Sequence, residues 1–356
     1  MTTFRIGLVG VGRGSGYGRV FAGDPRCQIV ACCDVKPEAV ARFQQELELP
    51  DSACFTSYDD FIATDFDIVF LGTPIPYHTE QTLKAVEAGK HVLSEVTAAS
   101  TVEDCGRIVE AVQRTGRRYM LAENCCYWPF VPQWREIIRA GRLGAVIHAE
   151  AEYIHDIRNM VYDPETKTQR WRANRAPLHY CSHSLGPLLE MMDDRITRAC
   201  GLGHSQHILP EGGIGGIDLQ VGLFETEKGA MIKLARSSVA PRKPALHWFM
   251  LQGSKGCVES SRRGIPGPGM LYLEDEMTDP QEIEVSTVDT SLPESARAGG
   301  HGTAEYSLVQ DFLHALEVGE KPPLDEIRAM DLTVPGLIAH ESSLQDGRWL
   351  EVPSFA

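Results

Sequence analysis

The chain lacks a positive charge balance and long apolar runs. Its formal net charge is −15, whereas a nucleic-acid partner would call for basic patches that meet phosphates, so we expect no nucleic-acid partner. No apolar run reaches the ~20 residues that cross a bilayer. Residues 1–3 lead directly into the first strand-like run and leave no room for a secretion signal. We therefore expect a cytoplasmic protein with no membrane partner.

The ten cysteines do not follow a metal-binding or redox pattern. No Cys-x-x-Cys spacing occurs, and Cys32, Cys33, Cys125 and Cys126 stand beside one another in pairs. Such cysteines are typical of free thiols in a reducing compartment. The neighbouring His155 and Asp156 have no third ligand at a suitable spacing, so we expect no metal site.

The chain does have an apolar run, residues 4–9, that ends in a cluster of glycines. A strand, a tight turn and a helix N-terminus in this order are typical of a pyrophosphate-binding site. Gly10 and Gly12 fit the pattern. Ser15 stands where the third glycine is expected, with Gly14 and Gly16 on either side of it.

A carboxylate follows the second apolar run at the position that the ribose of a dinucleotide requires. Asp34 stands 24 residues after Gly10 (34 − 10 = 24), close to the expected spacing of about 20. A carboxylate there accepts both ribose hydroxyls and repels a 2′-phosphate, so the sequence favours NAD over NADP. The alternative is a glycine-rich turn and a surface aspartate in a domain that binds no nucleotide.

Strand-like and helix-like segments alternate up to about residue 124, which predicts an α/β Rossmann domain with a doubly wound parallel sheet. Ligands of such sheets bind beyond the carboxyl ends of the strands. We expect His78 and Glu95 to flank the nicotinamide; the alternative for each is a hydrogen bond that stabilises a turn. The predicted cofactor-binding residues are Gly10, Gly12, Arg13, Gly14, Ser15, Asp34, Thr73, Pro74, His78, Glu95 and Asn124.

The second part of the chain has a different pattern. Residues 145–153 alternate like a half-exposed strand, and several further strand-like runs are separated by turns rich in glycine and proline. Residues 158–178 are polar and rich in arginine and are interpreted as a loop. We therefore predict a Rossmann domain over residues 1–124. Residues 125–356 would form an α+β domain with an open, mainly antiparallel sheet, and the segment from about 323 to 356 would pack back on the first domain.

Several motifs resemble those of the Gfo/Idh/MocA oxidoreductase family over nearly the whole chain. The resemblance implies an NAD-binding Rossmann domain and a substrate-binding open sheet, which often pairs with a second copy, so we expect a homo-oligomer. The motifs are the glycine turn, Thr73-Pro74 with His78, Gly89-Lys90-His91-Val92 leading to Glu95, and Leu350-Glu351-Val352-Pro353.

One departure from the family pattern points to a branch. Ordinary dehydrogenases of the family have Glu-Lys-Pro where this chain has Glu95-Val96-Thr97, and valine cannot transfer a proton. The chain is similar instead to NAD-dependent glycoside hydrolases typified by bacterial α-N-acetylgalactosaminidases. The motifs are Glu95-Val96-Thr97-Ala98-Ala99, Glu123-Asn124-Cys125-Cys126-Tyr127, His148-Ala149-Glu150, Tyr153-Ile154-His155-Asp156, Trp171-Arg172, Tyr180-Cys181-Ser182-His183-Ser184-Leu185-Gly186-Pro187 and Gly300-His301-Gly302.

The resemblance implies hydrolysis of a glycoside by transient oxidation at C3, removal of the C2 proton, elimination at C1, addition of water and re-reduction. It places Glu123, Tyr153 and His183 in the active site. We expect His183 to handle the C3 hydroxyl proton. Tyr153 would take the C2 proton if a neighbouring cation supports it, and Glu123 would orient either group or assist the leaving group. The alternatives are a structural histidine, a core tyrosine and a helix-capping glutamate.

The sugar is left open, because the segment before His183 departs from the branch and is shorter. We predict substrate contacts from Arg158, Trp171, Arg172 and Tyr180. The arginines of this segment, Arg170 and Arg175 among them, are solvated or capture a carboxylate or sulfonate on the sugar. The alternative functions are a sugar dehydrogenase with net hydride transfer, a lyase that stops at the enone, and a sensor without activity.

Overall fold

The computed structural model describes residues 3–163, 165–206, 208 and 216–356. The chain forms two compact units. Unit 1 comprises residues 1–127, 288–330 and 355–356, and unit 2 comprises residues 128–287 and 331–354. The predicted boundary at residue 124 lies close to the first division, but residues 288–330 return to unit 1 and residues 331–354 belong to unit 2. The assignment of cofactor and substrate to separate domains stays a prediction.

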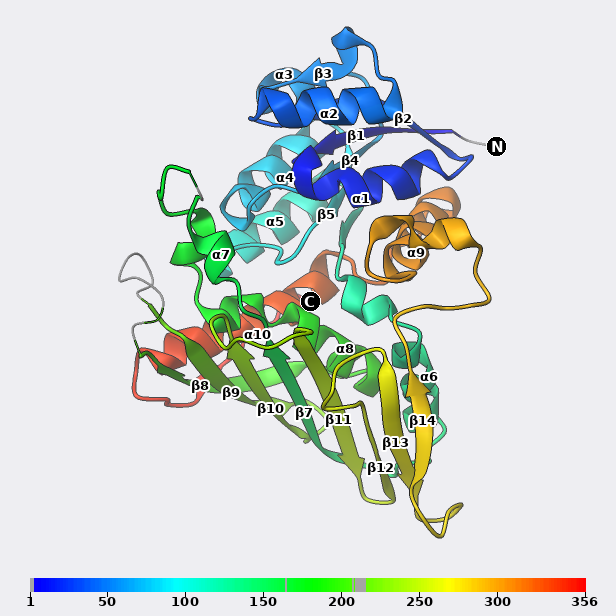
Figure 1. The fold of residues 1–356 in the computed structure, drawn as a ribbon, viewed down its shortest axis with the longest axis vertical. Helices are drawn as coiled ribbons and strands as arrows, with labels where there is room; N and C mark the ends of the chain where they lie inside the picture. The colour runs from blue at the N-terminus through cyan, green and yellow to red at the C-terminus, as the bar shows by residue number, and fades with distance from the viewer. Residues whose placement is uncertain (1–2, 164, 207, 209–215) are drawn as a thin grey trace. The chain divides into compact units, whose positions relative to one another are not determined.

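Unit 1 contains a six-stranded parallel sheet, which confirms the predicted Rossmann architecture (Figure 1). The sheet order is β3-β2-β1-β4-β5-β6. All its strand pairs are parallel. The central β4 is buried along its whole length, as expected of a strand that is covered on both faces. The strands are β1 (Phe4–Val9), β2 (Cys27–Cys33), β3 (Cys54–Phe55), β4 (Ile68–Leu71), β5 (His91–Ser94) and β6 (Tyr119–Leu121).

The helices of unit 1 begin and end where local sequence signals indicate. Thr101 caps α5 by accepting a hydrogen bond from the backbone N of Asp104 at 3.1 Å, and Gly116 ends the helix in the left-handed region. The helices include α1 (Val11–Ala22), α2 (Pro37–Leu47), α3 (Tyr58–Ile62), α4 (His78–Glu87), α5 (Val102–Thr115) and α9 (Ala304–Val318), and α10 (Glu326–Ser343) begins in this unit. Backbone N of Leu121 donates to the Leu324 carbonyl at 2.9 Å, so the later segment continues beside β6.

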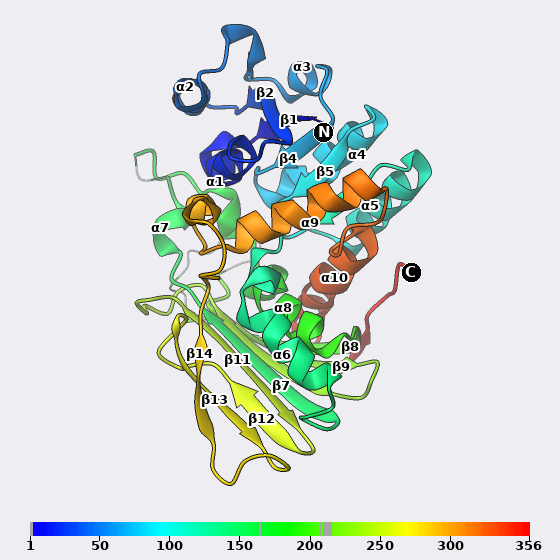
Figure 2. The ribbon, with the colours of Figure 1, turned by 90° about the vertical axis from the view of Figure 1, so that its right-hand side faces the viewer.

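Unit 2 contains a nine-stranded sheet that is mainly antiparallel, as predicted. Its order is β14-β13-β12-β11-β7-β10-β9-β8-β15, and β7 and β10 are its parallel pair. Helices α6 (Phe130–Arg139) and α8 (Ser182–Met192) lie on one face of the sheet (Figure 2). The strands are β7 (Val146–Ile154), β8 (Ile196–His204), β9 (Leu219–Thr226), β10 (Met231–Ser237), β11 (Leu246–Gly253), β12 (Gly256–Glu259), β13 (Gly267–Leu273), β14 (Gln281–Val285) and β15 (Leu350–Glu351).

The segment predicted as a loop, residues 158–178, contains short helices. These are α7 (Arg158–Val161), the 3-10 helix η4 (Trp171–Asn174) and the start of the 3-10 helix η5 (Pro177–Tyr180). Helices this short carry too few apolar positions to show a period in the sequence, and here Val161 and Leu178 supply the buried contacts. Among the described residues, no helix combines the length and the apolar character needed to cross a membrane.

Candidate functional site

The glycine turn of unit 1 has the geometry of a phosphate-binding turn. Gly10 adopts φ +78°, and an added Cβ would lie 2.5 Å from the carbonyl carbon of Gly72, so the close approach of two backbones requires glycine there. An added Cβ at Gly12 would meet nothing within 4 Å. Gly12 therefore faces open space at the start of α1, where backbone N–H groups and the helix dipole favour an anion.

The missing third glycine is replaced by its neighbours. That glycine normally lets helix and sheet pack closely. Here a Cβ on Gly14 would lie 3.2 Å from the Phe70 ring, and one on Gly16 would lie 2.5 Å from the Gly299 carbonyl oxygen. Ser15 instead points its hydroxyl back along the helix, 3.5 Å from the Gly12 carbonyl oxygen. The side chain of Arg13, also a predicted cofactor contact, lies outside the described part of the structure.

Asp34 lies directly beside the glycine turn. It follows β2, and its carboxylate accepts hydrogen bonds from the backbone N of Lys36 at 3.0 Å and of Gly12 at 3.4 Å. The half-buried Asp34 carboxylate thus lies beside the glycine turn, the position from which it can bind the ribose hydroxyls of a dinucleotide. The turn and Asp34 together fit the NAD predicted from the sequence.

His78 begins α4, after the turn that follows β4, where the sequence predicts the nicotinamide. It is fully buried, and its two ring nitrogens lie 2.8 Å from the carbonyl oxygens of Thr73 and Thr97. Burial lowers the pKa of His78, and the two carbonyls oppose this effect. Because both nitrogens face backbone carbonyls of the turns after β4 and β5, the geometry fits the alternative considered for His78, and its contact with the nicotinamide stays a prediction. Pro74 accepts from Tyr77 N in the same turn.

Glu95 and Val96 follow β5. Glu95 is buried, and its carboxylate accepts a hydrogen bond from the backbone N of Val96 at 3.2 Å. The Val96 side chain is 4% exposed, so an apolar group is packed where the related dehydrogenases carry a lysine. This packing leaves the position without a proton donor or acceptor.

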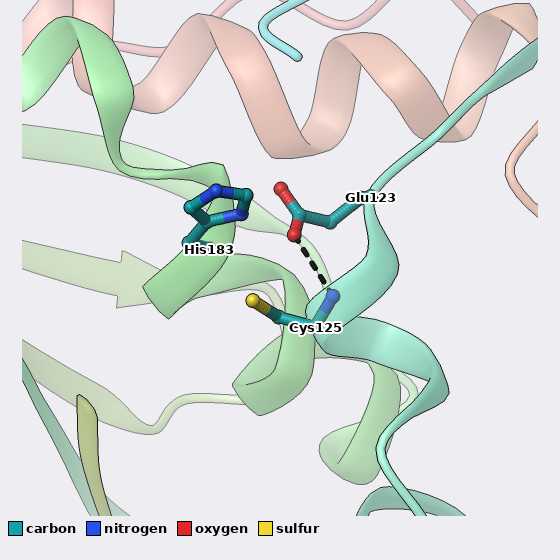
Figure 3. A group of neighbouring side chains, drawn as sticks. All are labelled: Glu123, Cys125 and His183. Atoms are coloured by element: carbon teal, nitrogen blue, oxygen red, sulfur yellow. Dashed lines mark hydrogen bonds between the residues drawn. The ribbon is translucent and has the colours of Figure 1, made fainter. Parts of the chain in front are cut away.

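Glu123 and Asn124 follow β6 and are both buried. The Glu123 carboxylate accepts a hydrogen bond from the backbone N of Cys125 at 3.2 Å, drawn in Figure 3. Burial raises the pKa of the Cys125 thiol, and Glu123 raises it further. Asn124 donates from Nδ2 to the Glu305 carboxylate at 3.4 Å. Glu305 also pairs with His301, so the Gly300-His301-Gly302 motif anchors the segment after β6.

In unit 2, Tyr153 lies at the centre of a ladder across three strands. Its register partner in β10 is Arg236, and its partner in β11 is His247. The Arg236 guanidinium lies 4.1 Å from the centre of the Tyr153 ring, and His247 stacks on that ring at 4.0 Å. The cation that Tyr153 requires for its predicted role is therefore present, and it is 1% exposed.

Two further histidines surround Tyr153. Its hydroxyl lies 2.8 Å from Nδ1 of His155, two residues further along the chain. Burial lowers the pKa of His155 to about 4, with Arg236 and Arg175 acting in the same direction, so the ring is neutral at pH 7. His183, in the first turn of α8 and labelled in Figure 3, has its ring 5.8 Å from that of Tyr153 and 4.9 Å from that of Tyr180.

The predicted substrate contacts have different surroundings. Arg158 is exposed and forms a double hydrogen bond with Asp156, at 2.9 and 2.6 Å. Arg172 lies over the Trp171 ring at 4.4 Å. Tyr180 contacts His183 edge-on, so it belongs to the cluster around Tyr153. The structure thus brings Tyr153, His183 and Tyr180 together and directs Arg158 to a carboxylate of its own segment.

The sequence interpretation missed Arg236 and His247 and gave His155 no role. His155 stands two positions after Tyr153, a spacing that puts both side chains on one face of an extended chain, and this signal was available although β7 itself ends at Ile154. Arg236 and His247 reach Tyr153 only through strand register across segments far apart in the sequence. Without a known pairing of β10 and β11 with β7, no local pattern identifies them.

Comparisons with known proteins match both parts of the chain. Residues 4–123 match a family model described as the oxidoreductase family, NAD-binding Rossmann fold, and residues 131–259 match the model of the GFO/IDH/MocA C-terminal domain. A glycosyl hydrolase family 109 protein of Saccharopolyspora erythraea is 28% identical, over 99% of this chain and 83% of that protein. One of Solibacter usitatus is 28% identical, over 99% and 88%.

Solved structures show the same fold. An oxidoreductase domain protein from Kribbella flavida matches with a TM-score of 0.85 and 23% identity, over 99% of this chain and all of that one. A levoglucosan dehydrogenase in complex with NADH and L-sorbose matches with a TM-score of 0.85 and 19% identity, over the full length of both chains. At these identities the likeness concerns the fold.

Proposed function

Because the chain belongs to the Gfo/Idh/MocA oxidoreductase family and carries its NAD-binding Rossmann fold, we propose that it is an NAD-dependent glycoside hydrolase. The family and the relatives named glycosyl hydrolase family 109 support an NAD-dependent glycosidase or sugar oxidoreductase. We propose further that cleavage proceeds through transient oxidation at C3, removal of the C2 proton, elimination, addition of water and re-reduction.

The cluster around Tyr153 is the observation that carries the proposal. A net dehydrogenase needs one group that takes the proton of the oxidised hydroxyl, whereas elimination needs a second group for the proton on C2. Unit 2 offers a phenol and an imidazole, Tyr153 and His183, with ring centres 5.8 Å apart. Val96 is buried at the position where the family pattern of ordinary dehydrogenases has a proton-transferring lysine, so that route is closed here.

Each group has a defined task in this proposal. When bound, NAD would supply the reversible oxidation at sugar C3 that makes the C2 proton acidic. His183 takes and returns the C3 hydroxyl proton. Tyr153 acts as a phenolate: neutral His155, within hydrogen-bond distance, accepts the phenol proton, and Arg236 beside the ring stabilises the negative charge. The phenolate oxygen then takes the C2 proton. Glu123 orients these groups or assists the leaving group.

The cofactor-side residues keep the roles that their positions suggest. We propose that Gly10, Gly12, Gly14 and Ser15 form the phosphate turn, and that Asp34 holds the ribose. Glu95 and Asn124 line the nicotinamide side, while His78, Thr73 and Pro74 position the backbone there. A cytoplasmic location and a homo-oligomer remain predictions.

The test uses purified protein without added cofactor and aryl glycosides of both anomers in heavy water. We expect free sugar that carries deuterium at C2, with no net absorbance of reduced nicotinamide. Stoichiometric NADH from a free sugar after NAD is added, with no glycoside cleaved, would instead identify a sugar dehydrogenase. Accumulation of an unsaturated sugar without hydration would identify a lyase.

A further inference from the structure

Arg175 is a cation without a negative partner in the arginine-rich segment of unit 2. Within the described residues, its side chain makes no hydrogen bond and no ion pair, and its Nε is buried without an acceptor. It lies over the Tyr180 ring at 4.1 Å and near the Trp171 ring at 5.7 Å. Ring stacking fixes the plane of the guanidinium but leaves its N–H donors unused.

The neighbouring arginines of the segment differ from Arg175 in this respect. Arg158 binds Asp156 through two N–H groups, and Arg170 binds Asp163 at 3.0 Å. Asp156 and Asp163 thus neutralise Arg158 and Arg170. The segment therefore contains carboxylates, but these two are already paired.

Arg236 is a second positive charge in this region without a carboxylate partner among the described residues. Arg236 is 1% exposed, and it donates hydrogen bonds to the carbonyl oxygens of Tyr153 and Ser237 and to no carboxylate among the described residues. Burial, together with the charge of Arg236, lowers the pKa of Arg175 to about 9. A buried guanidinium group and a half-buried one without a counter-charge are unfavourable, and a bound anion would correct this.

Arg175 is connected to the candidate catalytic groups through direct ring contacts. It stacks on Tyr180, whose ring meets that of His183 edge-on at 4.9 Å. His183 in turn contacts Tyr153. A group held by Arg175 would thus sit on the same ligand that His183 and Tyr153 act on.

We propose that Arg175 recognises an anionic group, a carboxylate or a sulfonate, at C6 of the sugar. The inference rests on the proposed function, because that chemistry occupies C1, C2 and C3 and leaves C6 as the exocyclic carbon that can carry the anion. The planar fork of Arg175 binds two oxygens of such a group at once, which a neutral hydroxymethyl group does not offer.

The experiment compares matched pairs of substrates and ligands. The substrates are 4-nitrophenyl glucosides, galactosides and mannosides of both anomers and the corresponding uronides, and the ligands are D-glucuronate and D-glucose titrated onto the protein with NAD. The proteins are wild type, Arg175→Met, Arg175→Lys and Arg142→Met. Arg142 is an exposed arginine of unit 2 that pairs with Glu276, so its loss controls for net charge.

We expect wild type to prefer a uronide by at least ~30-fold in kcat/KM, the scale of a hydrogen bond to a charged group. Arg175→Met should abolish this preference, Arg175→Lys should keep part of it, and Arg142→Met should keep all of it. Melting temperatures check that each variant folds.

The outcomes separate this inference from the proposed function. Cleavage of neutral and anionic glycosides at equal rates, or equal losses on both in Arg175→Met, would refute the anion site and leave the hydrolase standing. No cleavage, but tighter binding of glucuronate than glucose that Arg175→Met removes, would refute the hydrolase and support the anion site. Neither cleavage nor binding of any anionic sugar of the panel would refute the anion site.

Discussion

The candidate residues of the two units are assembled in different ways. In unit 1, the candidate cofactor-side residues follow the ends of parallel strands, and at Gly10, Gly12 and the carbonyls beside His78 the backbone itself is what the fold positions. In unit 2, the candidate residues are side chains from three strands and a helix that meet at Tyr153. A site built from backbone groups depends on the order of strand, turn and helix along the chain. A cluster of side chains from several strands depends on the register in which those strands pair. This contrast determines which residues a mutation should affect and how strongly.

The largest expected effect is the loss of the Tyr153 hydroxyl. Tyr153→Phe keeps the ring between Arg236 and His247 but removes the group that reaches His155. Turnover of a glycoside should fall about 10²–10⁴-fold, the usual contribution of a positioned acid or base. Deuterium exchange at C2 should fall in parallel, while the melting temperature should stay close to that of wild type.

The matched control is Tyr272→Phe in β13, which removes a hydroxyl from the same sheet away from the ladder. It should leave turnover unchanged. If Tyr153→Phe retained wild-type turnover and C2 exchange, Tyr153 would be a core aromatic, the alternative considered from the sequence.

In unit 1 the comparison is between two glycines of one turn. Gly10→Ala should lower the free energy of unfolding by at least ~2 kcal/mol, because left-handed backbone costs a non-glycine residue about 1–2 kcal/mol. The new Cβ would also collide with Gly72 at 2.5 Å. Gly12→Ala should leave stability unchanged, since its Cβ meets nothing, yet weaken NAD binding by roughly tenfold as the Cβ fills the phosphate space.

Chemical denaturation and NAD titration of both variants test this pair. Equal loss of stability, or unchanged NAD affinity in Gly12→Ala, would show that the open space beside Gly12 does not receive the phosphates. The comparison thus examines the backbone site without relying on turnover.

The contrast between the backbone site of unit 1 and the side-chain cluster of unit 2 also explains which features can be predicted from the sequence. The parallel sheet, its glycine turn and Asp34 are predictable because strand, turn and carboxylate are adjacent in the chain. The substitution of Gly14 and Gly16 for the third glycine is not, because it depends on Phe70 and Gly299, which pack there from distant segments.

In unit 2, the family motifs name Tyr153 and His183 as candidates, but sequence cannot order the strands of a mixed sheet. Arg236 and His247 therefore appear only in the structure. The structure is also needed to tell Arg158 from Arg175. Composition does not show which arginine of the segment forms an ion pair with an aspartate, as Arg158 does, and which has none, as Arg175.

Acid should destabilise the protein through histidines that both units hold neutral. Burial, with Arg117 and Arg118, lowers the pKa of His91 from 6.5 to about 4. The unfolded chain therefore binds the proton first as pH falls, so the stability from neutral His91 is present above about pH 6.5 and is lost toward about pH 4. In unit 2, His155 should act in the same direction.

Melting temperatures between pH 7.5 and pH 4.5 test this expectation. His91→Asn keeps an acceptor for the backbone N of Arg118, which donates to Nδ1 of His91 at 2.9 Å, but cannot take up a proton. Its melting temperature should fall less steeply with acid than that of wild type. Parallel curves for the two proteins would exclude His91 as a source of the acid loss.

The smallest expected effect uses the register that assembles the Tyr153 ladder. Three positions before Arg236 in β10 and before Tyr153 in β7, the same pairing joins Lys233 to Glu150, with Nζ 2.6 Å from the carboxylate. The lysine is 45% exposed, so solvent screens the pair. A double-mutant cycle with Lys233→Met and Glu150→Gln should give a coupling energy below ~1 kcal/mol, as for half-exposed ion pairs. A favourable value of roughly 0.2–1 kcal/mol supports the register independently of any activity, whereas an unfavourable coupling would contradict the pairing of Lys233 with Glu150.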